Sequence, residues 1–524
     1  MNLAKSKSKY LKCAILIISI CILLGALSAC LPFNISSPDT LDKDAIDNAA
    51  ATITTNSTDG LGEFNDGYSY VYTDKDLIDD FRAGNPNTPY DVSVVKVDMS
   101  QARGTQKNPY VITSIEDWDR FARNLDDNSI PSYGSGKYFV LANDIDFDGK
   151  DFHPIRFFNG TFYGLGNSLK NITHIGNDWQ YWDGKEYVEI PISGADAPLG
   201  YGVFCRTVNA VISDLIVERF NYREMLQTAV ETVHSRSSTN TGGIIGLSYG
   251  TDVILNCHTI GDVYSDIAYN SHVVGIGGLV GARTGAKQEL YMYRCSSEVT
   301  ISTKKELRYP AHGGLVGDTY GGGTLYIYDC AAKLISYTDS ASHTSAAAAV
   351  ALISGNALYM ENFEGYIDVN STNVAAGGSL FGIYSGGSVP ILKNCYIEGL
   401  YGAEDNKYAF AGVGGSYAVT VNNSTIGNIN VVKPTDKNYW TSYSGSYTIR
   451  LSGHKEYATS DLMCADAKTF FGNNFSQIWD VDKIGGLYDP ENSPVRNYLL
   501  AFVSYRNLTN GGNSEESVGI EDEL

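Results

Sequence analysis

The stretch Gly242-Gly243-Ile244-Ile245-Gly246 decides the fold class of this chain, because it recurs. Near copies, each with the sequence GGLVG, occupy 277–281 and 313–317, so the three copies start 35 and 36 residues apart. Weaker copies follow at 378–382, at 411–415 and, in degenerate form, at 346–352. An apolar strand with glycine at both ends cannot bury its face alone, whereas copies stacked in register bury a continuous column.

A polar residue and a cysteine follow the three clear copies and the weaker copy at 378–382, about 15 to 18 residues after each start. Four such pairs are present: Asn256-Cys257, Arg294-Cys295, Asp329-Cys330 and Asn394-Cys395. We extend this slot to Ile172, Leu215, Phe363 and Asn423, which gives eight slots that lie 28 to 43 residues apart. Neighbouring cysteines in register would hold their Cβ atoms about 4.8 Å apart, wider than the roughly 3.8 Å of a relaxed disulfide. We therefore expect an inward-facing column of small apolar thiols.

The repeat predicts a mostly β chain in which residues 107–432 form one parallel β-helix or related solenoid, most clearly between 242 and 415. A propeller blade of about 40 to 45 residues with four strands is the competing interpretation. We favour the solenoid because the period drifts and because each repeat offers few runs of strand length.

A short N-terminal module precedes the glycine repeats. Val111–Thr113 is predicted to be a strand, and Ser114 is a good helix N-cap, with Asp117 placed to reach back to it. One short helix follows, with an apolar face that comprises Ile115, Trp118, Phe121, Ala122 and Leu125. Tyr138–Phe147 alternates like a strand, and Pro154–Ile175 has the pattern of two more strands.

The first 29 residues have the features of a secretory signal peptide: a lysine-rich start and then a short apolar run. The run Cys13–Leu27 is too short for the roughly 30 Å hydrocarbon core of a bilayer. The sequence Leu27-Ser28-Ala29-Cys30 resembles a bacterial lipobox, so we expect cleavage before Cys30 and lipid on its sulfur. Ordinary signal cleavage near Ala29 is the alternative. The lipid would hold the protein in a cell membrane, exposed outside the cytoplasm.

Four further regions complete the predicted organisation. Residues 30–60 are rich in Asp, Ser, Thr and Asn and are expected to be a flexible stalk. Residues 61–106 form a pre-domain to which the sequence assigns no structure. Residues 433–505 are expected to close the solenoid, and 506–524 form an acidic tail.

Composition favours many short strands and argues against nucleic-acid binding. The chain has 54 Gly and 37 Tyr, and only 19% of its residues are charged. Its 38 Lys and Arg against 59 Asp and Glu give a net charge of −21, which becomes −25 without the four lysines of the leader. Such a field repels phosphate backbones.

The Gly-Gly-Leu-Val-Gly units with their following Asn-Cys resemble the GLUG motif of bacterial surface proteins, which occurs in adhesin-like proteins and in the non-catalytic part of some IgA-specific peptidases. The N-terminal module and the segment Phe470–Tyr498 resemble the flanks of the same proteins, so the resemblance covers about Lys107 to Tyr498. It implies a right-handed parallel β-helix at the cell surface, with adhesion or glycan contact. The peptidase activity is not carried over, because the eight histidines form no His-Glu-x-x-His pair.

Two motifs suggest chemistry. Gly246-Leu247-Ser248-Tyr249-Gly250 matches a serine-hydrolase elbow. Other repeats keep only the glycines at this place, so we interpret it as a corner where positive φ favours glycine. Asp144, Asp146 and Asp148 have the opening spacing of a calcium loop, but Ile155 stands where such a loop needs Glu. A looser calcium site is one interpretation; carboxylates that cap strands and face water are the other.

Tyrosines crowd the repeats. Tyr291 and Tyr293 share one strand face, and Tyr326 and Tyr328 occupy the matching positions of the next repeat. Aromatic ladders suit glycan stacking or protein contact, although they also stiffen neighbouring rungs.

We therefore expect a binding or adhesion module for a glycan or a surface protein, not an enzyme, with no cofactor unless calcium binds. Two other functions stay open. One is a glycan-cleaving enzyme that uses carboxylates such as Asp144 and Asp146, and the other is a structural spacer without a ligand.

Overall fold

The computed structural model describes residues 61, 68–72, 92–126, 134–175, 180–189, 200–224, 240–265, 274–285, 288–303, 310–338, 345–370, 381–385, 391–401, 411–413, 430–432 and 455–457. The chain divides into two units, Met1–Ala49 and Ala50–Leu524, and all the described residues belong to the second. The signal peptide, Cys30, the stalk, Asn423, the acidic tail and nearly all of the closing segment lie outside the described residues.

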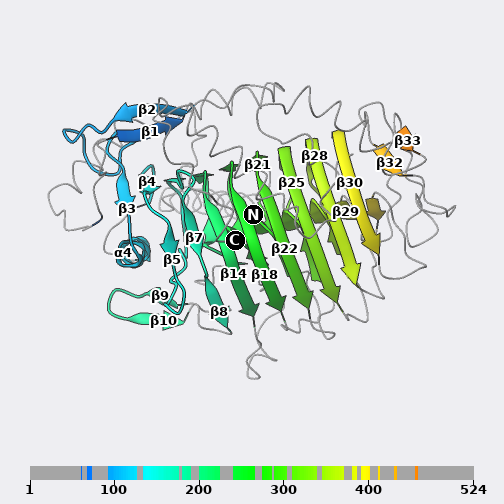
Figure 1. Cartoon of the computed structure of the whole chain (residues 1–524), viewed down its shortest axis with the longest axis horizontal. Coiled ribbons are helices and arrows are strands. Elements are labelled where there is room, and N and C mark those ends of the chain that lie inside the picture. Colours follow the sequence, from blue (N-terminus) through cyan, green and yellow to red (C-terminus); the bar gives the residue numbers. More distant parts are fainter. Residues whose placement is uncertain are drawn as a thin grey trace, which may run out of the picture. The chain divides into compact units, whose positions relative to one another are not determined.

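Each complete rung of the repeat region contains four strands, which stack on the next rung (Figure 1). Three such rungs are described in full: β11 (Gly200–Tyr201), β12 (Phe204–Thr207), β13 (Val211–Ser213) and β14 (Ile216–Glu224); β15 (Asn240–Gly242), β16 (Ile245–Ser248), β17 (Asp252–Leu255) and β18 (His258–Ser265); β19 (Val274–Gly277), β20 (Val280–Arg283), β21 (Glu289–Tyr293) and β22 (Ser296–Thr303). The expectation of few strands per repeat was therefore wrong, because the first three strands of each rung have only two to five residues.

Later rungs merge their last two strands into one long strand. The strands are β23 (Pro310–Gly313), β24 (Val316–Thr319) and β25 (Thr324–Thr338); β26 (Ser345–Ala347), β27 (Val350–Ser354) and β28 (Ala357–Asn370); β29 (Phe381–Ser385) and β30 (Ile391–Tyr401); then β31 (Ala411–Val413), β32 (Asn430–Val432) and β33 (Lys455–Tyr457).

The N-terminal module contains the one described helix and the first short strands. They are β1 (Tyr68–Tyr72), β2 (Val92–Lys96), β3 (Tyr110–Ile112), α4 (Ile115–Asp126), β4 (Tyr138–Leu141), β5 (Ile145–Asp146), β6 (Thr161–Tyr163), β7 (Ser168–Lys170), β8 (Thr173–Ile175), β9 (Gln180–Trp182) and β10 (Tyr187–Glu189). Of the pairings between described strands, only β1–β2 and β9–β10 are antiparallel. Rung stacks on rung in parallel register, which confirms the solenoid over the propeller.

Two walls of the solenoid belong to one sheet that bends at a corner. We call β3, β4, β6, β13, β17, β21 and the first halves of β25, β28 and β30 the tyrosine wall, and β5, β7, β8, β14, β18, β22 and the second halves of those strands the front wall. In Figure 1 the arrows of the front wall from β14 to β30 lie side by side and face the viewer. Two further sheets, β11–β15–β19–β23–β26 and β12–β16–β20–β24–β27–β29–β31, complete the rungs.

The corner between these walls explains why a polar residue precedes each slot. Its residues have left-handed backbone with φ between 47° and 56°: Asp214, Asn256, Arg294, Asp329 and Asn362. Asn and Asp tolerate this conformation best. Two rung-to-rung hydrogen bonds join their buried side chains, from Asn256 Nδ2 to Asp214 Oδ1 at 2.6 Å and from Asn362 Nδ2 to Asp329 Oδ1 at 2.8 Å.

The residue after each corner faces the core, as predicted. Buried residues at this position are Leu215, Cys257, Cys295, Cys330, Phe363 and Cys395, and the cysteines are free thiols. The assignment of Ile172 to the same column was wrong. Thr173 pairs with Asn221, so Ile172 lies in register with Phe220, after a second bend at Asn171 within the front wall.

Close packing, not left-handed backbone, explains the glycines of the repeat. A Cβ on the second glycine would meet the next rung's carbonyl: Gly243 against Gly278 O at 2.3 Å, Gly278 against Gly314 O at 2.1 Å, and Gly314 against Ala348 O at 2.0 Å. The predicted positive φ is present at Gly285 and Gly321, but not at Gly246 or Gly250. A Cβ on Gly250 would instead meet the backbone of the preceding rung, 2.4 Å from Asn209 N.

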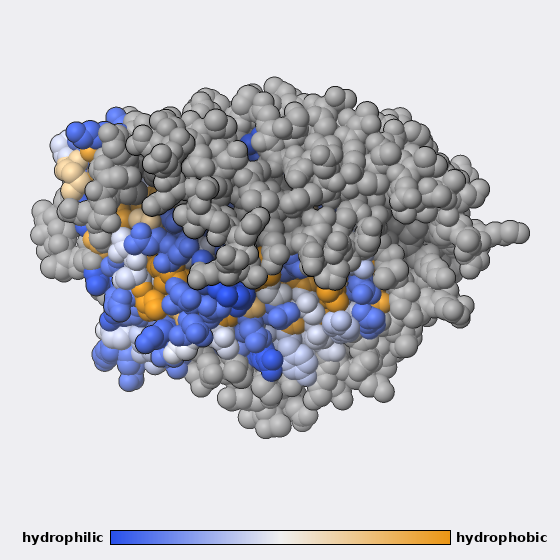
Figure 2. Space-filling view, in the orientation of Figure 1, coloured by the Kyte–Doolittle hydropathy of each residue, from blue (hydrophilic) through white to orange (hydrophobic). Residues whose placement is uncertain are grey.

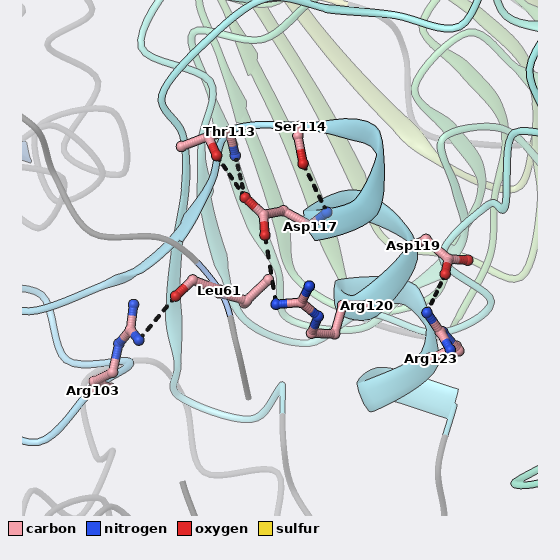
Figure 3. Close-up of polar contacts among 8 residues, drawn as sticks. All are labelled: Leu61, Arg103, Thr113, Ser114, Asp117, Asp119, Arg120 and Arg123. Carbon is pink, nitrogen blue, oxygen red and sulfur yellow. Dashed lines mark hydrogen bonds and ion pairs between the residues drawn. The ribbon is translucent and has the colours of Figure 1, made fainter. Parts of the chain in front are cut away.

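Helix α4 covers one end of the core with the predicted apolar face. Trp118, Phe121 and Ala122 are buried, and Ile115 and Leu125 pack against the same cluster. Ser114 Oγ accepts a hydrogen bond from Asp117 N at 3.2 Å, which makes Ser114 the N-cap (Figure 3). The Asp117 carboxylate was expected to bond back to Ser114. It instead accepts hydrogen bonds from the residue before, from Thr113 N and Oγ1.

Candidate functional site

The four tyrosines predicted to form a binding ladder are in matching register, but they do not form an open surface. Tyr291 pairs with Tyr326, and Tyr293 pairs with Tyr328, on the outer side of the tyrosine wall. However, Tyr291 and Tyr293 are 1% exposed and Tyr328 is 8% exposed, and they form a second apolar cluster with Val253 and Leu255. Only Tyr326 is half-buried.

These tyrosines contact one another along the stack, as the stiffening interpretation requires. The rings of Tyr291 and Tyr326 are stacked 4.7 Å apart at 4°, and those of Tyr326 and Tyr359 are 5.2 Å apart at 13°. Glu289 links the first pair, because it accepts hydrogen bonds from both hydroxyls at 2.8 and 3.5 Å. Burial raises the pKa of Tyr328, so its hydroxyl stays neutral. The column joins successive rungs and does not present a surface for a ligand.

Two exposed tyrosines lie on the front wall. Tyr264 is 36% exposed and Tyr337 is 45% exposed. Both belong to one column across the strands, whose register runs Arg223–Tyr264–Ser302–Tyr337–Asn370 from β14 to β28. A serine separates the two tyrosines, so they are two strand spacings apart, about 9.6 Å.

A second column beside the tyrosines carries hydrogen-bonding groups. Its register runs Asn221–Asp262–Thr300–Ile335–Asp368 over the same strands. Asp262 is exposed and lies two residues before Tyr264 on the same face. Asp368 is half-buried, and its burial raises the pKa of the carboxyl, while Asn370 Nδ2 donates a hydrogen bond to it at 3.2 Å. Each exposed tyrosine therefore has a carboxylate nearby.

The two lysines of the described front wall are paired with carboxylates. Lys333 Nζ lies 3.4 Å from Glu298 Oε1, and Lys170 Nζ lies 3.0 Å from Asp144 Oδ2. Figure 2 shows hydrophilic side chains interspersed with smaller apolar patches over the described part of this side. Such a mixed, exposed, aromatic surface can bind a ligand without covalent chemistry.

The spacing of these tyrosines from the slot residue is a signal for their exposure. Tyr264 follows Cys257 by seven residues, and Tyr337 follows Cys330 by seven residues. The slot residue faces the core, so an odd offset along the following strand points outward. Counting from the slot would have placed both side chains on the outer face, and Tyr337 was missed because only the tyrosines before the slot were compared.

The three aspartates of the calcium interpretation do not form a common site. Asp144 accepts a hydrogen bond from Ser168 N at 2.7 Å in addition to its ion pair with Lys170. Asp146 accepts hydrogen bonds from Asn171 Nδ2 and from Asp148 N, which lower its pKa. Within the described ranges, no group of three or more His, Cys, Asp and Glu side chains could hold a metal ion.

Ser248 of the hydrolase-like motif is a buried structural residue. Its hydroxyl donates a hydrogen bond to Asp252 Oδ2 at 2.6 Å, and Thr207 Oγ1 donates to the same oxygen at 2.7 Å. Asp252 also accepts a hydrogen bond from Ala210 N at 2.7 Å and so connects two rungs. A nucleophile needs access to substrate and a neighbouring base. This serine is 0% exposed, so it is a structural residue and not an accessible nucleophile, although the glycines of its motif lack the predicted positive φ.

A polar cluster on α4 was not predicted. Asp119 Oδ1 lies 2.9 Å from His153 Nδ1 and accepts a hydrogen bond from the Tyr187 hydroxyl, while Arg123 pairs with the other oxygen (Figure 3 shows Asp119 and Arg123). The rings of His153 and Tyr187 are stacked 3.7 Å apart at 3°. Burial alone would raise the pKa of Asp119, but the hydrogen bonds from His153 and Tyr187 outweigh it and lower the pKa.

Asp126 of the same helix has the opposite shift, since burial raises its pKa to about 7 against the opposing effect of Arg156. Carboxylates with divergent pKa values are typical of acid and base pairs. However, the Asp126 side chain is 2% exposed and is occupied by Arg156 and Trp182 N. The cluster therefore fastens the β9–β10 pair to α4 and gives a substrate no access to Asp126.

The described part of the chain contains no helix that is long and apolar enough to cross a membrane. No family model matches the sequence, and no curated protein matches it. A crystal structure of a "putative immunoglobulin A1 protease" from Bacteroides ovatus is similar, with a TM-score of 0.41 and 15% sequence identity over 72% of this chain and 91% of that chain. A likeness of this size carries no argument about this chain, and the GLUG resemblance stays a prediction.

Proposed function

We propose that the protein is a binding module that holds an extended glycan on the front wall and does not cleave it. The observation that supports this function is the exposed column of Tyr264 and Tyr337 on a wide parallel sheet. Tyrosine offers a flat apolar face to the C–H side of a sugar ring, and its hydroxyl stays available for hydrogen bonds. The column of Asn221, Asp262, Thr300 and Asp368 supplies further partners for sugar hydroxyls.

The geometry favours an elongated ligand that crosses the strands. The two tyrosines are about 9.6 Å apart along the stack, roughly the length of a disaccharide, so alternate sugar rings would lie over them. The strands repeat in this direction, whereas along one strand the described face carries a single exposed tyrosine. A chain laid across the rungs thus makes more contacts than a chain parallel to the strands.

The location and hand of the solenoid are part of the same proposal. The basic leader and the lipobox-like Leu27-Ser28-Ala29-Cys30 support a lipid anchor that leaves the binding wall outside the cytoplasm. A right-handed coil is supported by the strong preference for right-handed crossovers between parallel strands.

The test measures glycan binding by the purified full chain and by three tyrosine variants. A glycan array identifies an oligosaccharide, and calorimetry then compares Tyr264→Ala, Tyr337→Ala and the control Tyr249→Ala. Tyr249 is 40% exposed but lies outside the front wall. We expect a loss of about tenfold for each front-wall variant, or about 1.4 kcal/mol, and no change for the control.

Two results would contradict the proposal. One is the absence of binding to any oligosaccharide on the array. The other is release of new reducing ends from a bound polymer, since turnover would make the chain an enzyme. Equal losses in the front-wall variants and in Tyr249→Ala would show that the tyrosines act through stability instead of contact.

A further inference from the structure

We infer that the glycan held by the front wall carries free amino groups and is therefore cationic. The inference rests on the proposed glycan-binding function and adds the chemical class of the ligand. It is argued from the charges that surround the two exposed tyrosines.

Both tyrosines have a carboxylate within one step of the sheet. Asp262 lies on the same strand and face as Tyr264. Asp368 pairs with Ile335, the residue two before Tyr337, so it lies diagonally across from that tyrosine on the next strand. The two carboxylates are three strands apart and flank the tyrosine pair, so a bound chain passes both.

Positive charge near the tyrosines is scarce. The two lysines of the front wall are already paired, and the Lys333 side chain is only 6% exposed beside Glu298. In the two columns, as far as the structure describes them, Arg223 is the single cation against the two aspartates; it pairs with Tyr264 from β14, and its Nε donates a hydrogen bond to Asn221. The surface that a glycan would contact therefore has an excess of negative charge.

Tyrosine and carboxylate together favour an ammonium group over a carboxylate or sulfate. An ammonium ion is attracted to the face of an aromatic ring and forms a charged hydrogen bond with an aspartate. The net charge of −21 also concentrates cations near the protein and repels anionic polymers. A uronic-acid or sulfated chain would meet like charges at both flanks of the tyrosine pair.

The test compares three hexamers that differ mainly in charge: glucosamine, N-acetylglucosamine and galacturonate. Binding to the full chain is measured by calorimetry at pH 6, where the amines are charged. We expect the glucosamine hexamer to bind about tenfold more tightly than its N-acetylated counterpart, with the preference falling at high salt. The galacturonate hexamer should bind most weakly.

Variants that remove one carboxylate each test whether the two aspartates cause the preference for the glucosamine hexamer. Asp262→Asn and Asp368→Asn should each lower the ratio of the affinity for the amine to the affinity for the N-acetylated hexamer about threefold. Asp151→Asn, an exposed aspartate outside the front-wall strands, should have no effect.

The outcomes separate the two proposals. Equal binding of the amine and N-acetylated forms, or tighter binding of galacturonate, overturns the cationic ligand and leaves the glycan function intact. No binding of any hexamer, together with an empty glycan array, overturns both. Concentration-dependent dimerisation that Tyr264→Ala abolishes would identify a second copy of the chain as the occupant and would likewise overturn both.

Discussion

Single residues at the corner between the tyrosine wall and the front wall determine where each rung turns. The left-handed residues Asp214, Asn256, Asp329 and Asn362 turn the chain between the two walls and hydrogen-bond in pairs from rung to rung. Arg294 occupies the same corner without the advantage of a short polar side chain, and its guanidinium lies over the Tyr293 ring. The corners therefore require a backbone conformation more strictly than they require one residue type.

Asp318 makes stability depend on pH. It is buried in β24, its Oδ1 has no hydrogen-bond partner, and burial raises its pKa to about 7. The folded chain then keeps a proton between about pH 4 and 7 that the unfolded chain releases, so the free energy of unfolding falls as pH rises through this window. We expect Asp318→Asn to stabilise the protein at pH 8, by up to about 4 kcal/mol, and to change little at pH 4.

Urea unfolding at pH 4, 6 and 8 checks this prediction. Asp126 and Asp329 have pKa values raised to about 7 as well, so the variant should retain part of the slope of the parent. A difference between variant and parent that is the same at all three pH values would show that the Asp318 carboxyl is not the cause.

At the scale of one rung, glycine sets how closely neighbouring coils approach. Gly243, Gly278 and Gly314 lie directly against the carbonyl of the following rung, and Ala348 fills the fourth position of the column. Small side chains lie opposite two of them, Ser297 beside Gly278 and Ala332 beside Gly314. The repeat motif is thus a packing requirement between coils, and it predicts where a methyl group is not tolerated.

Gly314→Ala should destabilise the protein by several kcal/mol. Its new Cβ would lie 2.0 Å from Ala348 O and 2.8 Å from Ala332 Cβ, and backbone cannot move aside as a flexible side chain can. The control is Ala348→Gly in the same column, which should cost about 1 kcal/mol through chain entropy. Chemical denaturation compares the two, and equal effects would refute the close-packing account.

The alternation of inward and outward residues along each strand explains which positions the sequence could predict. The core slots followed from alternation after a fixed corner, so Cys257, Cys295 and Cys330 were placed correctly. Ile172 was misplaced because Asn171 adds a bend that the period does not reveal. The burial of Tyr291 could not be predicted, since alternation shows which side of a strand a residue occupies but not whether that side is covered.

At the scale of the whole molecule, the sequence predicts attachment to a membrane, and the residues that carry this prediction lie outside the described ranges. The proposed lipid on Cys30 would fix one end of the chain to a membrane, and the negative charge of the rest would keep it away from anionic surfaces. Intact-mass spectrometry of the membrane-extracted protein should give a chain that starts at Cys30 and carries acyl groups. Cys30→Ser should release the protein from the membrane fraction, and retention of that variant would contradict the anchor.

The parallel stack of rungs also determines how the protein would respond to mechanical load. The hydrogen bonds between rungs run along the stacking direction, so a pull in that direction stretches them one ladder at a time. Each rung contacts its neighbours in sequence, and one that detaches leaves the next rung intact. If one end of the chain is anchored and a ligand bound far from the anchor pulls on it, the chain would therefore lengthen in small successive steps. Each step would dissipate work before the full force reaches the anchor.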